Sequence, residues 1–405
     1  MEAYGRVKAN KGAAGIDGES IKDFEENLKC NLYKIWNRMS SGCYFPPAVK
    51  TVEIPKADGK KRKLGIPTVG DRIAQMVVKM QLEPCVEPHF HPDSYGYRPK
   101  KSAIQALGVA RTRCWKYDWV IDMDIKGFFD NIDHELMMKA VIKHTQEPWI
   151  LLYVRRWLEA PSQEVDGTIT KRARGTPQGG VISPLLANMF LYYAFDEWMK
   201  RNYSGNPFER YADDIVVHCK TEKDAIKLKD AIKKRLSECK LELHPEKTKI
   251  VYCKDENRKD DSQHVKFDFL GYTFRPRSAR NKDGKLFVSF SPAMGEKKKK
   301  DVRGEIKSLM KRVGPTGTLE EFVSIINPVV TGWIEFYGKF TASEMWSTMQ
   351  YIDINLIRWA KRKYSNIKSG WRKGTRWLTG IKSRQPMLFK HWQWMKRRDW
   401  DRRAV

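Results

Sequence analysis

The sequence predicts a protein of the α+β class, in which a mixed first part is followed by a helical second part. Two observations support this prediction. Strand-like runs alternate with helical patterns through the first part, and the strand pattern almost disappears after Pro292. A chain of 405 residues is also long enough to hold two or three domains.

Strands in the first part are predicted where β-branched and aromatic residues are concentrated. These runs are residues 49–55, 118–125, 214–220, 249–253 and 285–291. Residues 71–87 and 224–240 instead repeat apolar side chains at helical spacing. Residues 254–264 are polar and predict a loop.

The second part is predicted to be helical, with helices within residues 295–313, 319–340 and 344–364. We therefore expect three domains, with boundaries after residues 291 and 357. They are residues 1–291, 292–357 and 358–405.

The last segment is strongly basic and rich in tryptophan. Between Arg358 and Val405, sixteen Lys and Arg residues stand against two Asp residues. The interleaved tryptophans are Trp359, Trp371, Trp377, Trp392, Trp394 and Trp400. Basic side chains bind phosphates and flat rings stack on unpaired bases, so the segment predicts contact with DNA or RNA. The alternative is a solvated helix face with its tryptophans in a core.

Composition favours a polyanionic partner, because the formal net charge is +27. The seven cysteines include no C-x-x-C pair, which argues against a zinc site or a disulfide framework. No stretch of eighteen apolar residues occurs, so we expect no membrane span. The expected location is the cytoplasm, or the nucleoid of a bacterium.

The first chemical motif is the run Tyr211-Ala212-Asp213-Asp214, which lies between strand-like flanks and predicts a hairpin tip. Adjacent carboxylates repel each other unless a divalent cation neutralises them. A plain Asp-Asp turn without chemistry is the alternative.

A second acidic element favours the metal site. Asp122 and Asp124 share one face of a predicted strand, opposite Ile121, Met123 and Ile125. Carboxylates from this strand and the hairpin could converge on two Mg²⁺ ions, with Mn²⁺ as a substitute. Two such ions catalyse in-line phosphoryl transfer. Helix caps and surface acids are the alternative interpretation.

These motifs occur in an order that resembles the reverse transcriptases encoded by group II introns. The strand with Asp124-Ile125-Lys126-Gly127-Phe128-Phe129 comes first, residues 174–184 follow, and the Tyr-Ala-Asp-Asp run comes third. Further similar blocks are residues 10–18, 54–67, 94–99, 244–249 and 269–272. The resemblance spans roughly residues 8–345 and implies a right-hand polymerase, with fingers, an antiparallel palm sheet and a helical thumb.

The resemblance also implies roles for single residues. Asp124, Asp213 and Asp214 would be catalytic and bind the metals, with Asp122 secondary. Lys56 and Arg62 would grip the triphosphate, although an exposed basic hairpin is the alternative. Three further residues would complete the nucleotide site: Gln178, Gly179 and Tyr211. Gln178 and Gly179 lie in a turn where the backbone can approach the nucleotide, and the alternative for this turn is a simple connection between strands. Phe128, or Phe129 in its place, would exclude a 2′-hydroxyl, unless both rings are ordinary core.

Residues 326–337 resemble the maturase-specific segment that forms the thumb and binds intron RNA. The expected nucleic-acid contacts are Lys247, Lys249, Arg358, Lys361, Arg362, Lys363, Arg372, Lys373, Arg376, Arg397 and Arg398. The implied partners are group II intron RNA, a DNA target or primer, and deoxynucleoside triphosphates.

The resulting expectation is an RNA-directed DNA polymerase that also assists intron splicing and mobility by target-primed reverse transcription. The alternatives are an RNA-binding splicing factor without polymerase activity and a host-defence reverse transcriptase. No paired-cysteine, histidine-rich segment precedes Val405, so second-strand cleavage by an endonuclease domain is not expected. Only about ten residues precede Asn10, fewer than the family's N-terminal extension would need.

Overall fold

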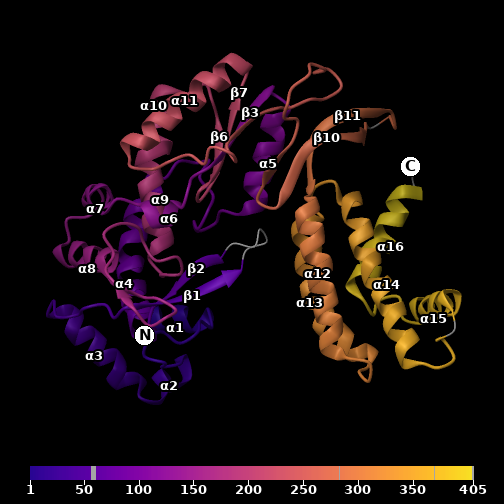
Figure 1. The fold of residues 1–405 in the computed structure, drawn as a ribbon, viewed down its shortest axis with the longest axis horizontal. Helices are drawn as coiled ribbons and strands as arrows, with labels where there is room; N and C mark the ends of the chain where they lie inside the picture. The colour runs from indigo at the N-terminus through magenta and orange to yellow at the C-terminus, as the bar shows by residue number, and fades with distance from the viewer. Residues whose placement is uncertain (56–60, 282, 369, 404–405) are drawn as a thin grey trace. The chain divides into compact units, whose positions relative to one another are not determined.

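A computed structural model describes residues 1–55, 61–281, 283–368 and 370–403, with side chains described up to residue 397. The chain forms two compact units (Figure 1). The first unit contains residues 1–106 and 121–249, and the second contains residues 107–120 and 250 onward.

The first unit begins with helices packed around α4 (Val69–Val86). Tyr4 and Val7 of α1 and Phe24 of α2 bury their side chains in one cluster with Ile73 of α4. Ser20 and Thr68 begin α2 and α4 by accepting hydrogen bonds from backbone N–H groups three residues ahead. The other helices of this unit are α1 (Glu2–Ala9), α2 (Ile21–Glu26), α3 (Leu28–Ser40), η1 (Glu87–His89), α6 (Phe128–Asn131), α7 (His134–Ile142), α8 (Pro148–Glu159), α9 (Ser183–Leu191), η2 (Tyr192–Asp196), α10 (Glu197–Asn202) and α11 (Glu222–Glu238). Helix α5 (Ala103–Cys114) begins in the first unit, and its residues from 107 onward belong to the second.

Two sheets lie in this unit. One has the strand order β2-β1-β4-β5, from β1 (Val49–Pro55), β2 (Lys61–Ile66), β4 (Ser162–Gln163) and β5 (Ile169–Thr170). In the other, β6 (Phe208–Tyr211), β7 (Asp214–Cys219) and β3 (Trp119–Asp124) lie in that order. Strands β6 and β7 form an antiparallel hairpin, as predicted.

The alternation predicted for β3 is confirmed. Ile121, Met123 and the following Ile125 are buried, whereas Asp122 and Asp124 are half-buried on the opposite face. The apolar residues therefore fix the strand in the core and leave the two carboxylates on one side of the sheet.

The second unit contains an antiparallel sheet with the order β11-β10-β9, followed by helices. Its strands are β9 (Phe267–Phe269), β10 (Tyr272–Arg280) and β11 (Leu286–Met294), and β8 (Lys249–Tyr252) precedes them. Its helices are α12 (Glu296–Val313), α13 (Leu319–Tyr337), η3 (Ala342–Met345), α14 (Trp346–Lys363), α15 (Trp371–Arg384) and α16 (Lys390–Arg403).

The helices of the second unit pack on one another, α12 against α13 and α14, α14 against α15, and α13 against α16 (Figure 1). The predicted change from mixed to helical structure is confirmed, because every element after Met294 is a helix in the part of the chain that the structure describes. The domain boundaries stay a prediction. The compact units divide at residues 249 and 250, and α14 runs unbroken across residue 357.

The helices of the described residues do not include a membrane span. None is both long enough and apolar enough to cross a bilayer.

Candidate active site

The Tyr-Ala-Asp-Asp run forms the tip of the β6-β7 hairpin. Tyr211 pairs with Asp214 across the hairpin, so Ala212 and Asp213 are the two loop residues. Ala212 has a φ of +58°, in the left-handed region that few residues with a side chain adopt. A Cβ atom on Gly96 would lie 2.4 Å from the Ala212 nitrogen, so glycine is required where the two segments meet.

A buried arginine supports this turn. Arg210 is fully buried, and its guanidinium donates to the two carboxylate oxygens of Asp196 at 2.7 and 2.6 Å. It also donates to Asn188 Oδ1 at 2.9 Å and to the Ala212 carbonyl oxygen at 3.3 Å. The Asn188 amide donates to the Gly96 carbonyl at 2.6 Å. Arg210, Asp196 and Asn188, which we call the turn anchor, therefore fix both segments.

Sequence reasoning missed the turn anchor. The available signal was a single arginine inside a strand-like flank, because a buried charge needs a partner. That signal does not say which carboxylate is the partner, since Asp196 is 14 positions away and meets Arg210 only through the tertiary fold.

Two of the predicted carboxylates lie within electrostatic range of each other. Burial raises the pKa of Asp213, and the negative charge of Asp124 raises it further. The positive charges of Arg62 and Lys247 act in the opposite direction on the same pKa. The structure thus brings Asp124, Asp213, Arg62 and Lys247 into one neighbourhood.

The segment before β8 lies beside the end of β3. The His244 backbone N–H donates to the Asp124 carbonyl oxygen at 2.7 Å, and an isolated β-bridge joins Ile125 to Leu243. From this segment, Lys247 Nζ reaches Asp124 Oδ2 at 2.9 Å. Lys247 therefore contacts a predicted catalytic carboxylate directly, whereas Lys249 is exposed at the start of β8.

Strand β2 joins the predicted nucleotide-binding turn. Arg62 Nε donates to Gln178 Oε1 at 2.6 Å, and the Gly65 N–H donates to the Gln178 carbonyl at 2.7 Å. Gly179 has a φ of +119°, and a Cβ atom there would lie 2.4 Å from the Gly65 carbonyl oxygen. The space left by the missing side chain of Gly179 therefore admits β2, and contact of this turn with the nucleotide stays a prediction.

The aromatic candidates differ in exposure. Phe128 and Phe129 are both buried, with ring centroids 5.4 Å apart, and the Phe128 ring also lies 6.4 Å from Phe190. Tyr211 is half-buried, and its ring centroid lies 6.2 Å from that of Tyr97. Tyr97 is 51% exposed and was not among the predicted nucleotide-binding residues. Lys56 lies outside the described residues.

A closed metal cage is not present in the part of the chain that the structure describes, where no three His, Cys, Asp or Glu side chains are grouped to hold one ion. The pair of Asp124 and Asp213 nevertheless has the ligand chemistry of a Mg²⁺ site. Its donors are carboxylate oxygens, and Mg²⁺ uses one or two carboxylates together with substrate phosphates. The mutual repulsion of Asp124 and Asp213 is of the kind that a cation relieves.

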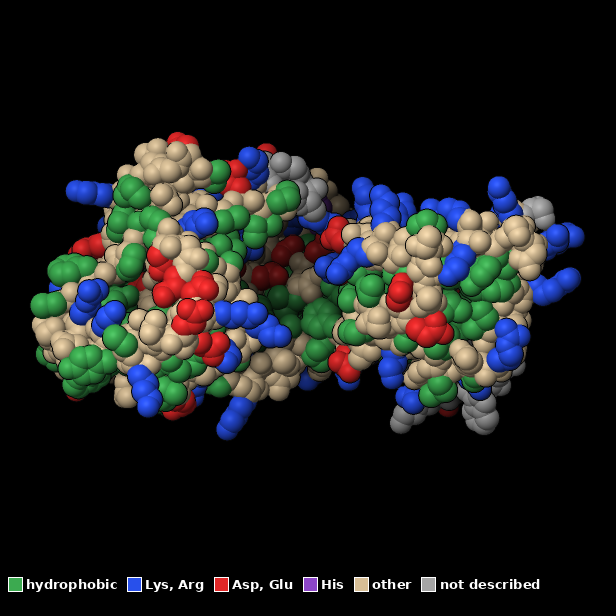
Figure 2. All heavy atoms as spheres, turned by 90° about the horizontal axis from the view of Figure 1, so that it is seen from below, with side chains coloured by type: hydrophobic (Ala, Val, Ile, Leu, Met, Phe, Trp, Pro, Cys, Tyr) green, Lys and Arg blue, Asp and Glu red, His purple; other side chains and the backbone are tan. Residues whose placement is uncertain are grey.

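The predicted nucleic-acid contacts of the second unit lie on α14, α15 and α16. Those with exposed side chains are Arg358, Arg362, Arg372, Lys373, Arg376 and Arg397, and Lys361 is half-buried. Lys363 instead donates to the carbonyl oxygens of Thr316 and Gly317. The Arg398 side chain lies outside the described residues. Figure 2 shows Lys and Arg side chains spread over the helical unit on the face in view.

The tryptophans of the last segment are divided between core and surface. Trp359 and Trp392 are buried, Trp377 and Trp394 are half-buried, and Trp371 is exposed. The core alternative therefore holds for Trp359 and Trp392. The Trp400 side chain lies outside the described residues.

Comparison with known proteins gives two family matches. Residues 54–274 match the model described as reverse transcriptase (RNA-dependent DNA polymerase). Residues 299–377 match the model described as group II intron, maturase-specific domain.

Curated relatives are similar to parts of the chain. Protein YkfC of Escherichia coli K12 is 33% identical over 260 residues, which are 62% of this chain and 64% of YkfC. Group II intron-encoded protein LtrA of Lactococcus lactis subsp. cremoris is 36% identical over 193 residues, 47% of this chain and 32% of LtrA. The putative COX1/OXI3 intron 1 protein of Saccharomyces cerevisiae is 28% identical over 200 residues, 49% of this chain and 24% of that protein. The chain thus matches less than two thirds of each of these relatives.

Proposed function

The chain belongs to the reverse transcriptase family and carries a group II intron maturase-specific domain, and on this premise we propose that it is an RNA-directed DNA polymerase. The observation that carries the proposal is the meeting of Asp124 and Asp213 beside Arg62 and Lys247. Acids and cations from separate elements converge there, as nucleotide addition requires.

The carboxylates would hold two Mg²⁺ ions, or Mn²⁺ in their place. Asp124 and Asp213 are the primary ligands in this proposal, with Asp214 beside them on β7 and Asp122 secondary on β3. When bound, the ions stabilise the charge that develops on the attacking and leaving oxygens of the phosphoryl transfer.

The chain's own residues would position the nucleotide. Arg62 offers fixed positive charge to the triphosphate, and its hydrogen bond to Gln178 holds it over the turn before α9. Lys247 holds the Asp124 carboxylate through a contact of 2.9 Å from its Nζ to Oδ2. The turn anchor holds the hairpin tip, so that Asp213 keeps its place when substrates bind.

The proposal predicts that Asp213→Ala with Asp214→Ala abolishes primer extension on an RNA template. Loss of charge stabilisation of this kind lowers the rate by about a thousandfold or more. The assay is incorporation of deoxynucleotides into a DNA primer.

A matched control is Asp260→Ala with Asp261→Ala, which removes two adjacent acids from an exposed loop. That variant should extend the primer at the unmodified rate. Full extension by the Asp213/Asp214 variant would refute the site assignment.

The match of residues 299–377 favours a second activity, in which the protein stabilises its intron RNA during splicing. The partners would then be group II intron RNA, a DNA target or primer, and deoxynucleoside triphosphates, in the cytoplasm or nucleoid. Splicing should persist in the Asp213/Asp214 variant, because RNA binding does not need those acids. Loss of splicing in this variant, with folding intact, would contradict a separate maturase activity.

A further inference from the structure

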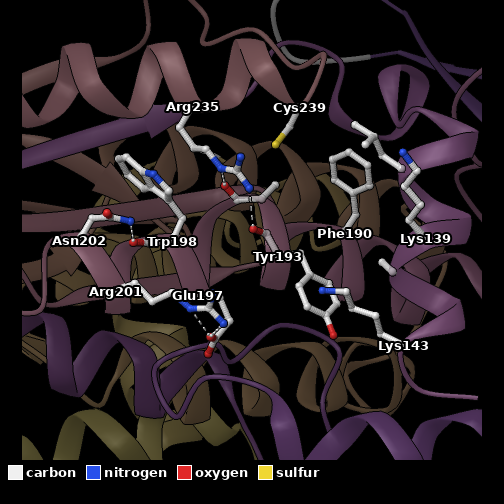
Figure 3. A pocket seen from close by; sticks show the side chains of 13 residues that line it. Lys139, Lys143, Phe190, Tyr193, Glu197, Trp198, Arg201, Asn202, Arg235 and Cys239 are labelled. Carbon is white, nitrogen blue, oxygen red and sulfur yellow. Dashed lines mark hydrogen bonds and ion pairs between the residues drawn. The ribbon is translucent and has the colours of Figure 1, made fainter.

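The first unit contains a cavity of about 490 Å³ that none of the predicted site residues lines. Its walls come from three helical stretches: α7, the continuous run of α9, η2 and α10, and α11 (Figure 3). Its volume falls within the range of pockets that hold small ligands.

The cavity is positively charged. Four cationic side chains line it, Lys139, Lys143, Arg201 and Arg235, against the single carboxylate of Glu197. Glu197 is already paired with Arg201 at 3.2 Å. Among the described residues, no carboxylate lies within ion-pair distance of Lys139 or Lys143. Both side chains are exposed; Lys139 is on α7, and Lys143 caps its C-terminal end four positions later. This pair is therefore available to an anionic ligand.

Flat and apolar surfaces accompany the charge. Trp198 lies at one end of the cavity and is backed by Tyr203, with ring centroids 5.0 Å apart (Figure 3). Phe190 and Ala140 contribute apolar lining, and Phe190 lies between Trp198 and the lysines in the view of Figure 3. Lys143 Nζ lies 5.0 Å from the Tyr193 ring centroid, which holds the ammonium group beside the lining.

The wall that carries these rings has an unusual backbone. Tyr192–Asp196 is a π-helix between α9 and α10. Arg235 donates to the carbonyl oxygens of Tyr193 and Ala194 at 3.1 and 3.2 Å, which satisfies acceptors of this segment. Single π turns within α-helices occur frequently at functional sites. The backbone and the charged lining thus point independently to a binding role.

We propose that this cavity binds a nucleotide, with the base against Trp198 and the apolar lining and the phosphate at Lys139 and Lys143. Stacking on an aromatic ring and charge-assisted contacts to phosphate are the two interactions by which proteins bind unpaired nucleotides. The nucleotide is either an unstacked residue of an RNA strand or a free mononucleotide. Neither source depends on the polymerase activity proposed above, because the lining residues lie outside that site.

The experiment is photo-crosslinking of the full chain, mapped by mass spectrometry. One probe is a short single-stranded RNA with one 4-thiouridine, and the other is 8-azidoadenosine monophosphate. The variants are Lys139→Gln with Lys143→Gln, and separately Trp198→Ala. The control is Lys223→Gln with Lys227→Gln, which removes the same charge from exposed positions of α11 outside the cavity.

We expect crosslinks to peptides that contain Tyr193 or Trp198, reduced about tenfold in both cavity variants and unchanged in the control. Because one phosphate is neutralised, a fourfold increase in salt should reduce crosslinking of the RNA about 2.6-fold in the unmodified chain. Crosslinking by the RNA but not the mononucleotide assigns the site to a strand, and the reverse assigns it to a free nucleotide. Absence of crosslinks from both probes, or an equal loss in the control, overturns the proposal.

Discussion

At the scale of single residues, Asp71 in the first turn of α4 is a buried carboxylate with three donors. It accepts hydrogen bonds from the Tyr44 hydroxyl at 3.0 Å, the Trp157 indole at 2.7 Å and the Gln75 amide at 2.9 Å. Burial raises the pKa of Asp71 to about 6, above its ordinary value of 3.8. The folded state therefore binds this proton more tightly than the unfolded state.

The contribution of Asp71 to stability should be fully present below about pH 4 and lost as the pH rises through about 6. By neutral pH the free energy of unfolding should have fallen by roughly 3 kcal/mol on account of this group. Urea unfolding across this range, compared between the unmodified chain and Asp71→Asn, measures the effect. The variant should lack this slope and the exposed-site variant Asp260→Asn should keep it; equal slopes in all three proteins would contradict the prediction.

The turn anchor makes a second prediction at this scale. Arg210→Leu leaves Asp196 buried without its partner, which should lower the free energy of unfolding by about 3–5 kcal/mol. Adding Asp196→Leu should restore much of that stability, because no unpaired charge remains. The double variant should still extend primers slowly, with a lowered kcat and an unchanged KM, because the Ala212 carbonyl has lost its donor.

Arg155→Leu is the matched control, because its ion pairs with Glu135 and Glu159 are exposed. Its effect on stability should stay below about 1 kcal/mol. Full extension by the Arg210/Asp196 double variant would show that the anchor does not position the turn.

At the scale of elements, Asp353 of α14 joins the two C-terminal helices. It accepts from Lys382 Nζ of α15 at 2.6 Å, and from His391 Nε2 at 3.0 Å and Trp392 Nε1 at 2.7 Å of α16. His391 is fully buried, and burial lowers its pKa. One carboxylate thus satisfies donors from both helices.

Asp353→Ala should therefore loosen α15 and α16 while the first unit keeps its structure. Removing the partner of buried donors costs about 1–3 kcal/mol for each group left unpaired. Hydrogen exchange followed by mass spectrometry should show faster exchange in residues 371–397. Asp301→Ala, at an exposed site on α12, is the control, and unchanged exchange in the Asp353 variant would contradict the role.

Sequence predicted the elements well where one physical signal dominated. Strand β1 has the predicted bounds, Val49–Pro55. Helix α11 was predictable because its apolar residues repeat at helical spacing, and it begins two residues before its predicted start. Helices α15 and α16 were not predicted individually, because their basic composition obscures that spacing. Strands β4 and β5 have two residues each and are too short to show a pattern.

The candidate site was also predictable only where a signal is local in the sequence. Carboxylate spacing indicated Asp122, Asp124, Asp213 and Asp214 as candidates, and the family resemblance selected Asp124, Asp213 and Asp214 among them. Their catalytic role stays a prediction. The pairing of Arg62 with Gln178 was not predicted, since 116 positions separate them. The turn anchor was missed for the same reason, because only tertiary packing brings its residues together.

At the scale of the whole molecule, the net charge of +27 predicts that RNA affinity depends steeply on salt. For single-stranded RNA, the logarithm of the binding constant should fall with the logarithm of salt concentration by about 0.7 for each phosphate contacted. Arg372→Gln with Arg376→Gln on α15 should therefore reduce this slope by about 1.4. Binding isotherms at several salt concentrations provide the measurement.

The reference for that prediction is Lys223→Gln with Lys227→Gln, which changes the net charge equally. If general attraction alone governs binding, both double variants will change the slope by the same amount. If α15 contacts phosphates, the Arg372/Arg376 variant alone will change it substantially.

The π-helix of Tyr192–Asp196 sets the rotational phase of everything that follows it along α10. A π turn arises when one extra residue is accommodated in an α-helix, and each α-helical residue advances the side chains by about 100°. That one residue therefore aims Asp196 at Arg210 and also directs Trp198 and Arg201 into the cavity. Deleting one residue of this segment would rotate Asp196 away from Arg210, and Trp198 and Arg201 away from the cavity. A change in the length of this π-helical segment would therefore alter the hairpin tip and the cavity together.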